Sequence, residues 1–316
     1  MTKLIKILFL GIAILIILIV VLFGYKDKSV EELKLKYATT PSSFIEMDGL
    51  NVHYRDEGVT TDSIPLVLIH GTGSSLHTFN DWVTELKTKK RIIRMDLPGF
   101  GLTGPFPDSD YSMKNYVRFI KHFLDSKGIK HCILGGNSLG GEIAWQFTVK
   151  NPEHVEKLIL IDAAGYPLES ESVPIAFTMA RTPVLNKLLT FITPRFMVQS
   201  SIENVYADKS KITKTLIDRY FNLTLRDGNR QALVDRMTTP YDTIAVNLIK
   251  TIQQPTLILW GDQDLLIPTK SAYRFQTDLP NDTLVILKNV GHVPMEESPQ
   301  KSLIPLLNFL KSEYIF

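Results

Sequence analysis

Short apolar runs alternate with segments of helical periodicity along most of the chain. These short apolar runs predict strands at 66–69, 91–95, 132–135, 158–161, 256–260 and 284–287, most of them apolar enough to be buried on both faces. An initial antiparallel pair is predicted at 44–47 and 52–55, joined through Asp48 and Gly49. Helical spacing predicts helices at 79–87, 113–126, 139–150, 269–277 and 299–311. This alternation predicts an α/β fold with a largely parallel sheet covered by helices.

The strand pattern stops between about residues 166 and 250. Helical segments punctuated by proline replace it, for example at 175–180 and 184–192. We therefore predict a helical cap over 166–250, inserted into a core that comprises 44–165 and 251–312. The apolar residues of the cap can line a lipophilic pocket or pack the cap onto the core: Phe177, Met179, Leu185, Leu188, Leu189, Phe191, Phe196 and Met197.

The N-terminus has a different composition from the rest of the chain. Residues 4–23 are uncharged except for Lys6, and about 20 such residues match the length of a bilayer-spanning helix. This predicts a single-pass transmembrane anchor. The alternative is a cleaved signal peptide, but positions 20–25 lack a small-residue cleavage pattern. The lysines at the start favour an extracytoplasmic globular part, although four lysines on the far side weaken that inference: Lys26, Lys28, Lys34 and Lys36.

Composition narrows the classes of partner. The chain has 316 residues and a formal net charge of +2, and its first 28 residues hold four lysines and one aspartate. The remainder therefore carries a small negative charge and offers no basic field for nucleic acid. A single cysteine, Cys132, excludes an intrachain disulfide and a multi-cysteine metal site.

The strongest chemical signal is a G-x-S-x-G motif at 136–140, between the apolar run 132–135 and the helical pattern 139–150. Such a motif makes a sharp turn from strand to helix that exposes the serine hydroxyl, and the glycines remove side chains that would clash. Ser138 is therefore the candidate nucleophile. A glycine-rich turn with an incidental serine is the alternative.

A serine hydroxyl needs a base to take its proton and an acid to orient that base. His292 follows the strand 284–287, at the edge where open α/β sheets carry their sites, and is the candidate base, with His77 as an alternative. Asp264 follows the strand 256–260 and is the candidate acid. Asp262 and Asp162 are its rivals, since each also lies near a strand end.

The backbone N–H groups of Thr72 and Leu139 are the predicted oxyanion donors, because each follows a strand that ends beside Ser138. His70, in the same turn as Thr72, is expected to hold the loop rather than to act as an acid or base.

These segments together resemble the α/β-hydrolase superfamily across about residues 44–312. The resemblance is carried by 70–73, 96–101, the turn at Ser138, 260–264 and 291–292, with the order Ser138, Asp264, His292. It implies an eight-stranded, mostly parallel sheet with a helical cap after the strand that ends near Asp162. Within the family the chain looks most like the capped carboxylesterases and lipases, including membrane-anchored members.

The expected activity is hydrolysis of a small, lipophilic ester through an acyl-enzyme on Ser138, which needs no metal or organic cofactor. Haloalkane dehalogenases and epoxide hydrolases carry aspartate at the position of Ser138, so alkyl-enzyme chemistry is disfavoured. Carbon–carbon hydrolases of aromatic ring cleavage share the serine motif and remain an alternative, although they commonly carry tryptophan where Val293 stands. A non-catalytic membrane-tethered binding module is the third possibility.

Two glycine motifs lack the context that nucleotide binding needs. The G-x-G-x-x-G at 99–104 is followed by Pro105 and Pro107 instead of a helix, which argues against a dinucleotide site. The glycine spacing at 135–140 has Gly141 at the position of the phosphate-binding lysine.

Overall fold

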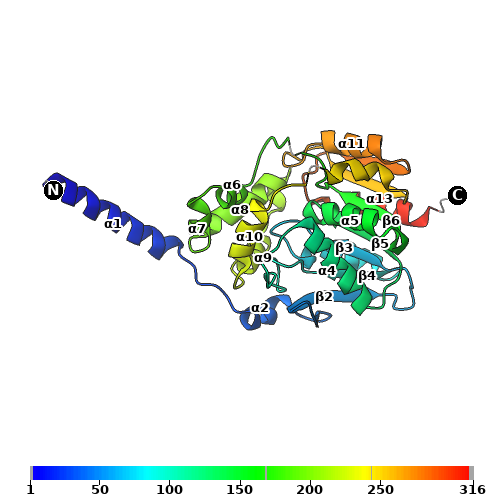
Figure 1. Cartoon of the computed structure of the whole chain (residues 1–316), viewed down its shortest axis with the longest axis horizontal. Helices are drawn as coiled ribbons and strands as arrows, with labels where there is room; N and C mark the ends of the chain where they lie inside the picture. Colours follow the sequence, from blue (N-terminus) through cyan, green and yellow to red (C-terminus); the bar gives the residue numbers. More distant parts are fainter. Residues whose placement is uncertain (1–2, 168, 243, 313–316) are drawn as a thin grey trace.

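An eight-stranded sheet forms the centre of the molecule (Figure 1). The computed structural model describes residues 3–167, 169–242 and 244–312. The strand order is β1-β2-β4-β3-β5-β6-β7-β8. The strands are β1 (Ser43–Met47), β2 (Leu50–Gly58), β3 (Leu66–Ile69), β4 (Arg91–Met95), β5 (Cys132–Asn137), β6 (Val155–Ile161), β7 (Thr256–Gly261) and β8 (Asp282–Leu287).

The pairing confirms a mostly parallel α/β sheet. Strands β1 and β2 pair antiparallel, as do β2 and β4, and every pairing from β4 through β8 is parallel. The central strands β3 and β5 are completely buried, in agreement with their uninterrupted apolar sequence. Parallel pairing places the carboxyl ends of β3 and β5–β8 along one edge of the sheet.

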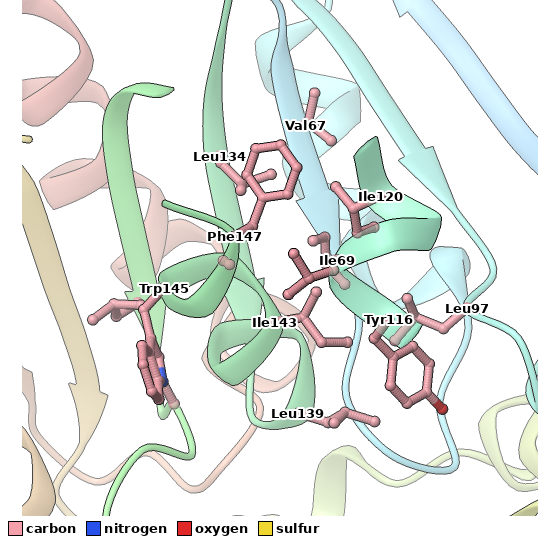
Figure 2. Close-up of a cluster of buried hydrophobic side chains, with 14 of the residues drawn as sticks. Val67, Ile69, Leu97, Tyr116, Ile120, Leu134, Leu139, Ile143, Trp145 and Phe147 are labelled. Atoms are coloured by element: carbon pink, nitrogen blue, oxygen red, sulfur yellow. The ribbon is translucent and has the colours of Figure 1, made fainter. Parts of the chain in front are cut away.

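Helices cover both faces of the sheet. One face packs against α4 (Met113–Ser126), α5 (Leu139–Lys150) and α11 (Lys270–Asp278), and the other against α3 (Asn80–Leu86) and α13 (Pro299–Lys311). Successive side chains of β3 point to opposite faces of the sheet. Val67 and Ile69 belong to the core under α4, α5 and α11 (the first core), and Leu66 and Leu68 to the core under α3 and α13 (the second core). Figure 2 shows Ile69 and Leu134 of the sheet facing side chains of α4 and α5 in the first core.

A helical insertion follows β6 and precedes β7. Its helices are α6 (Ile175–Arg181), α7 (Leu185–Leu189), α8 (Arg195–Val205), α9 (Lys214–Thr224) and α10 (Asn229–Thr238). We use "helical insertion" for 175–238. Within the described part of 166–250 no element is a strand, and positions 168 and 243 lie outside the described residues. The insertion lies over the carboxyl edge of the sheet (Figure 1).

The prediction of a transmembrane anchor at 4–23 is wrong. This segment forms α1 (Lys3–Phe23), but none of the helices in the described ranges combines the length and apolarity that a membrane crossing demands. The predicted membrane localisation, with the orientation derived from it, is therefore also wrong. The prediction rested on the length of an uncharged run. Such a run indicates a helix, but it does not by itself indicate the surroundings of that helix.

The end of α1 is attached to the helical insertion. Gly24 forms an antiparallel bridge with Ile192, and the Thr193 N–H donates to the Phe23 carbonyl at 3.2 Å. The ring of Phe23 meets that of Phe196 edge-on at 5.9 Å. The residues after α1 therefore belong to the packed protein.

A second short helix, α2 (Val30–Tyr37), was not predicted from its charged sequence. Ser29 caps it by accepting a hydrogen bond from the Glu32 N–H, and its buried residues Leu33 and Tyr37 pack on the globular part. The Tyr37 carbonyl accepts a hydrogen bond from His77 Nε2 at 2.9 Å. The imidazole of His77 is thus neutral and structural, and burial lowers its pKa to about 3.

Helix α5 approaches the sheet so closely that only glycine fits at its start. A Cβ on Gly140 would lie 2.2 Å from the Ile69 carbonyl oxygen, and one on Gly136 would lie 2.1 Å from the Gly140 carbonyl oxygen. Backbone atoms of the sheet cannot yield as a flexible side chain does. This close packing fixes where α5 begins.

We expect Gly140→Ala to destabilise the protein by about 3 kcal/mol, the upper part of the range for overpacking, because the clash is with backbone. Gly135→Ala is the matched control, since its nearest contact is the Leu68 side chain at 3.1 Å. Urea unfolding of both variants measures the difference, and equal losses would contradict the packing argument.

We expect His77 to make stability fall as the pH falls below about 6.5. Its pKa in the folded protein is lowered to about 3, so between these pH values the unfolded chain binds a proton that the folded protein does not. The contribution lost between pH 6.5 and 5 is about 2 kcal/mol. His77→Gln should flatten this part of the stability profile, measured by urea unfolding at each pH, with His131→Gln as a control at an exposed position. Parallel profiles for wild type and His77→Gln would contradict the assignment.

Candidate active site

Ser138 occupies a strained turn between β5 and α5. Its backbone has φ 55° and ψ −118°, a conformation that residues other than glycine rarely adopt. The Ser138 N–H donates to the Ile161 carbonyl at 3.0 Å, and the Ser138 carbonyl accepts hydrogen bonds from Glu142 and Ala164. The strain is therefore held by bonds to both β6 and α5.

His292 and Asp264 come together from the loops after β8 and β7. His292 Nδ1 and Asp264 Oδ2 are 2.6 Å apart, and both side chains are buried. Asp264 Oδ1 also accepts hydrogen bonds from the N–H groups of Leu266 and Ile267, each at 2.9 Å. The carboxylate is thus fully engaged, and it fixes the orientation of the imidazole.

Ser138 and His292 border the same cavity. Asn137, the residue before the serine, donates from Nδ2 to the His292 carbonyl at 2.9 Å and so ties the two loops together. Across the described ranges the Ser138 hydroxyl has no hydrogen-bond partner. In unliganded enzymes such bonds are often long and tighten when substrate binds.

Asp162 lies beside this pair. Its Oδ1 accepts a hydrogen bond from the Gly261 N–H at 2.9 Å, while its buried Oδ2 has no hydrogen-bond partner among the described residues. Burial, and then the negative charge of Asp264, raise the pKa of Asp162 well above its usual range. Both effects favour the protonated form of Asp162 beside the Asp264 carboxylate.

The same cluster is the one group within the described ranges with the donor types and spacing of a metal site. Three ligating atoms lie within 4.8 Å of one another, one each from Asp162, Asp264 and His292. Both Asp264 oxygens, however, already accept hydrogen bonds, and a divalent cation needs several open oxygen or nitrogen donors. The donor set fits a hydrogen-bonded relay better than a metal centre.

Two backbone N–H groups are free beside Ser138. Leu139 is the first residue of α5, and Thr72 lies in the turn after β3. Neither N–H has an acceptor within the described part of the chain. The turn after β3 is close to the serine, because a Cβ on Gly71 would lie 3.0 Å from Ser138 Cβ.

The rival residues have structural partners. His70 Nδ1 donates to the Gly71 carbonyl and His70 Nε2 accepts from the Leu97 N–H, which holds the turn as expected. Asp262 Oδ1 accepts from the Asn289 N–H at 2.7 Å. His77 borders neither cavity that contains Ser138.

One important residue was missed from the sequence. Asp96 is completely buried, and its carboxylate accepts hydrogen bonds from the N–H groups of Leu76 and Leu102 and from His53. Burial alone would raise the pKa of Asp96, but the charge and hydrogen bond of His53 hold it below its usual range. Asp96 lies within the segment 96–101 that carries the family resemblance, so that segment was the available signal.

A narrow cavity of about 100 Å³ leads from Ser138 under the helical insertion. It is mainly apolar, and Phe177, Leu189 and Met197 are the residues of the predicted pocket lining that border it. Four others from the predicted list are exposed: Leu185, Leu188, Phe191 and Phe196. Arg230 also borders this cavity and is fully paired, with Asp27, the Tyr25 carbonyl and Thr193 as its acceptors.

The helical insertion also contacts the His292 loop directly. The His292 N–H donates to the Val205 carbonyl at 2.8 Å. Glu297, five residues later, accepts from the Gly291 N–H at 2.7 Å and from the Asp208 N–H at 2.8 Å. The loop that carries the imidazole is therefore positioned from both the sheet and the insertion.

Comparisons with known proteins agree with this architecture. The family model described as alpha/beta hydrolase fold matches residues 64–299. The uncharacterized hydrolase YugF of Bacillus subtilis is 28% identical over 277 residues, which cover 87% of this chain and 99% of that protein. Lipase 1 of Psychrobacter immobilis is 26% identical over 285 residues, which cover 86% of this chain and 82% of that protein.

A solved structure, that of Lip1 from Acinetobacter baumannii AYE, is similar over nearly its whole length. It is 28% identical with a TM-score of 0.73, and the match covers 92% of this chain and 99% of that one. The family model covers well over half of the chain, and the eight-stranded, mostly parallel sheet is consistent with it. The protein belongs to the alpha/beta hydrolase fold family.

Proposed function

We propose that the protein is a serine hydrolase that cleaves carboxylic esters through an acyl-enzyme on Ser138. The observation that carries the proposal is the buried contact of 2.6 Å between His292 and Asp264, at a cavity that Ser138 also borders. A histidine oriented in this way can take the serine proton as the hydroxyl attacks a carbonyl.

In the proposed mechanism, the proton of Ser138 passes to His292 Nε2 as the serine oxygen bonds to the carbonyl carbon. Asp264 stabilises the imidazolium that forms. The N–H groups of Thr72 and Leu139 stabilise the negative charge on the carbonyl oxygen, typically by about 3 kcal/mol each. The imidazolium then gives its proton to the leaving alcohol, and an acyl-enzyme remains.

Water completes the reaction. His292 takes a proton from the water as its oxygen attacks the acyl-enzyme, and returns that proton to Ser138 when the acid leaves.

The helical insertion acts in this proposal as a cap that excludes water and shapes the substrate site. The apolar lining of the narrow cavity supports a small, lipophilic substrate. Similarity to Lipase 1 of Psychrobacter immobilis is consistent with an ester.

We expect Ser138→Ala to lower the hydrolysis of 4-nitrophenyl esters by roughly 10⁴-fold or more while the protein remains folded, because only the nucleophile is lost. Initial rates across an acyl-chain series measure the effect. Ser201→Ala is a matched control, since Ser201 borders the same cavity and its hydroxyl donates to the Met197 carbonyl. Equal rates for wild type and Ser138→Ala would refute the nucleophile.

A fluorophosphonate probe separates the competing functions. Labelling that disappears in Ser138→Ala supports a serine hydrolase, whereas folded protein that is never labelled supports a binding module. A labelled enzyme that cleaves vinylogous diketones but no ester would be a carbon–carbon hydrolase instead.

We expect Asp264→Asn and Asp162→Asn to differ strongly. Asparagine at 264 removes the charge that stabilises the imidazolium, so kcat should fall by roughly 10⁴-fold. Asparagine at 162 resembles the protonated carboxyl that the raised pKa of Asp162 favours, and should cost less than about tenfold. Steady-state kinetics of both variants, with unfolding midpoints as a check on folding, make the comparison. The reverse order would assign the acid to Asp162.

A further inference from the structure

We propose that the substrate carries an anionic group on its acyl part, which binds two arginines in a second cavity beside Ser138. This inference rests on the proposed ester hydrolysis and specifies its substrate class. The substrate would be a half-ester of a dicarboxylic acid, or a similar anionic acyl ester, with an apolar alcohol.

The second cavity measures about 360 Å³ and, like the first, is bordered by Ser138. Thr72, Ser138, Phe177 and Leu266 border both cavities. A carbonyl bound at Ser138 can therefore extend one substituent into each. The two cavities differ in chemistry, because the second is bordered by Arg181 and Arg236.

Arg181 is available to a ligand. It is the last residue of α6, is exposed at the cavity, and forms no hydrogen bond or ion pair with any residue in the described ranges. A guanidinium in this position offers a planar pair of donors that matches a carboxylate.

Arg236 of α10 is only partly paired. Its Nη2 lies 3.5 Å from Glu142 Oε2, and its buried Nε has no partner among the described residues. Burial raises the pKa of Glu142, which reduces its ability to neutralise Arg236, although Arg236 acts in the opposite direction. The cavity thus presents two guanidinium groups against one carboxylate. In the first cavity, by contrast, Arg230 is occupied by Asp27.

The position of His292 assigns the two parts of the ester to the two cavities. His292 borders the first cavity and not the second, whereas Thr72 borders both and Leu139 the second. The leaving oxygen must receive its proton from His292, so the alcohol extends into the first, apolar cavity. The acyl part then extends into the second cavity, towards the arginines.

The test compares two esters with the same leaving group. 4-Nitrophenyl hydrogen adipate has a terminal carboxylate on its acyl chain, and 4-nitrophenyl methyl adipate has this carboxylate capped. The ratio of the kcat/KM values of the two esters reports the contribution of the anion, because the reacting carbonyl and the leaving group are the same in both. We expect the wild type to prefer the anionic ester by about tenfold, as charge-assisted hydrogen bonds allow.

This preference should disappear in the double variant Arg181→Gln/Arg236→Gln and fall about threefold in Arg181→Gln, the exposed position that does not threaten folding. It should also weaken with added salt, because Arg181 is exposed. Arg195→Gln is the matched control: Arg195 belongs to the same insertion, pairs with Asp218 and borders neither cavity. An unchanged ratio in both arginine variants overturns the proposal.

A reversed pair of substrates tests the orientation. 4-Carboxyphenyl hexanoate places the anion on the alcohol, and its methyl ester is the neutral partner. A preference for this anionic alcohol that depends on the arginines overturns the assignment of the acyl part to the second cavity.

A binding measurement distinguishes failure of the proposed reaction from failure of this inference. Ligand-observed NMR with Ser138→Ala compares monomethyl adipate with dimethyl adipate, and needs no catalysis. Tighter binding of the anion that is lost when both arginines are replaced supports the cationic site even if no ester is hydrolysed. Equal binding of the two compounds overturns it.

Discussion

The close approach of α5 to the carboxyl edge of the sheet is the constraint on which the rest of the site depends. Glycine at 136 and 140 removes every atom that would separate the helix from β3 and β5, where a Cβ would lie within 2.2 Å of backbone oxygens. The turn at Ser138 can then adopt its positive φ with the Leu139 N–H unpaired beside it. Strain at one residue is maintained here by hydrogen bonds from two elements, as strained functional residues generally require.

The helical insertion and the sheet share control of the imidazole. Asp264 orients the ring of His292 from the sheet side, while Val205 and Glu297 hold its backbone against the insertion. Glu296 adds a buried cluster in which it accepts hydrogen bonds from Tyr206 and Tyr220 and pairs with Arg219. Movement of the insertion would therefore disturb His292 as well as the cavity, so the shape of the cavity and the position of His292 are linked.

Much of the core could be predicted because its signals are local. An apolar run that is buried on both faces specifies a central parallel strand, and helical spacing gave the bounds of α4, α5 and α13 residue for residue. Positions of Asp264 and His292 followed from the rule that sites lie at the carboxyl ends of strands. Interactions between distant segments left no such signal. The contacts of Asp96 with His53 and of His292 with Val205, and the cavity that Arg181 and Ser138 both border, depend on tertiary packing. The uncharged N-terminal run led to a different error. Its composition was used to predict a membrane environment, whereas it correctly indicated only a helix.

The charges around the two cavities favour one orientation of a bound ester. Arg230, which borders the apolar cavity, is neutralised by Asp27, so that it is not a free charge to attract polar ligands. Arg181 and Arg236 border the second cavity, where Glu142 is the one carboxylate among the described lining residues. A charged group that enters the first cavity loses its hydration without gaining an oppositely charged partner. An anion in the second cavity can pair with the arginines. An ester with unlike ends would thus bind in one orientation, and that orientation sets its leaving oxygen on the side of His292.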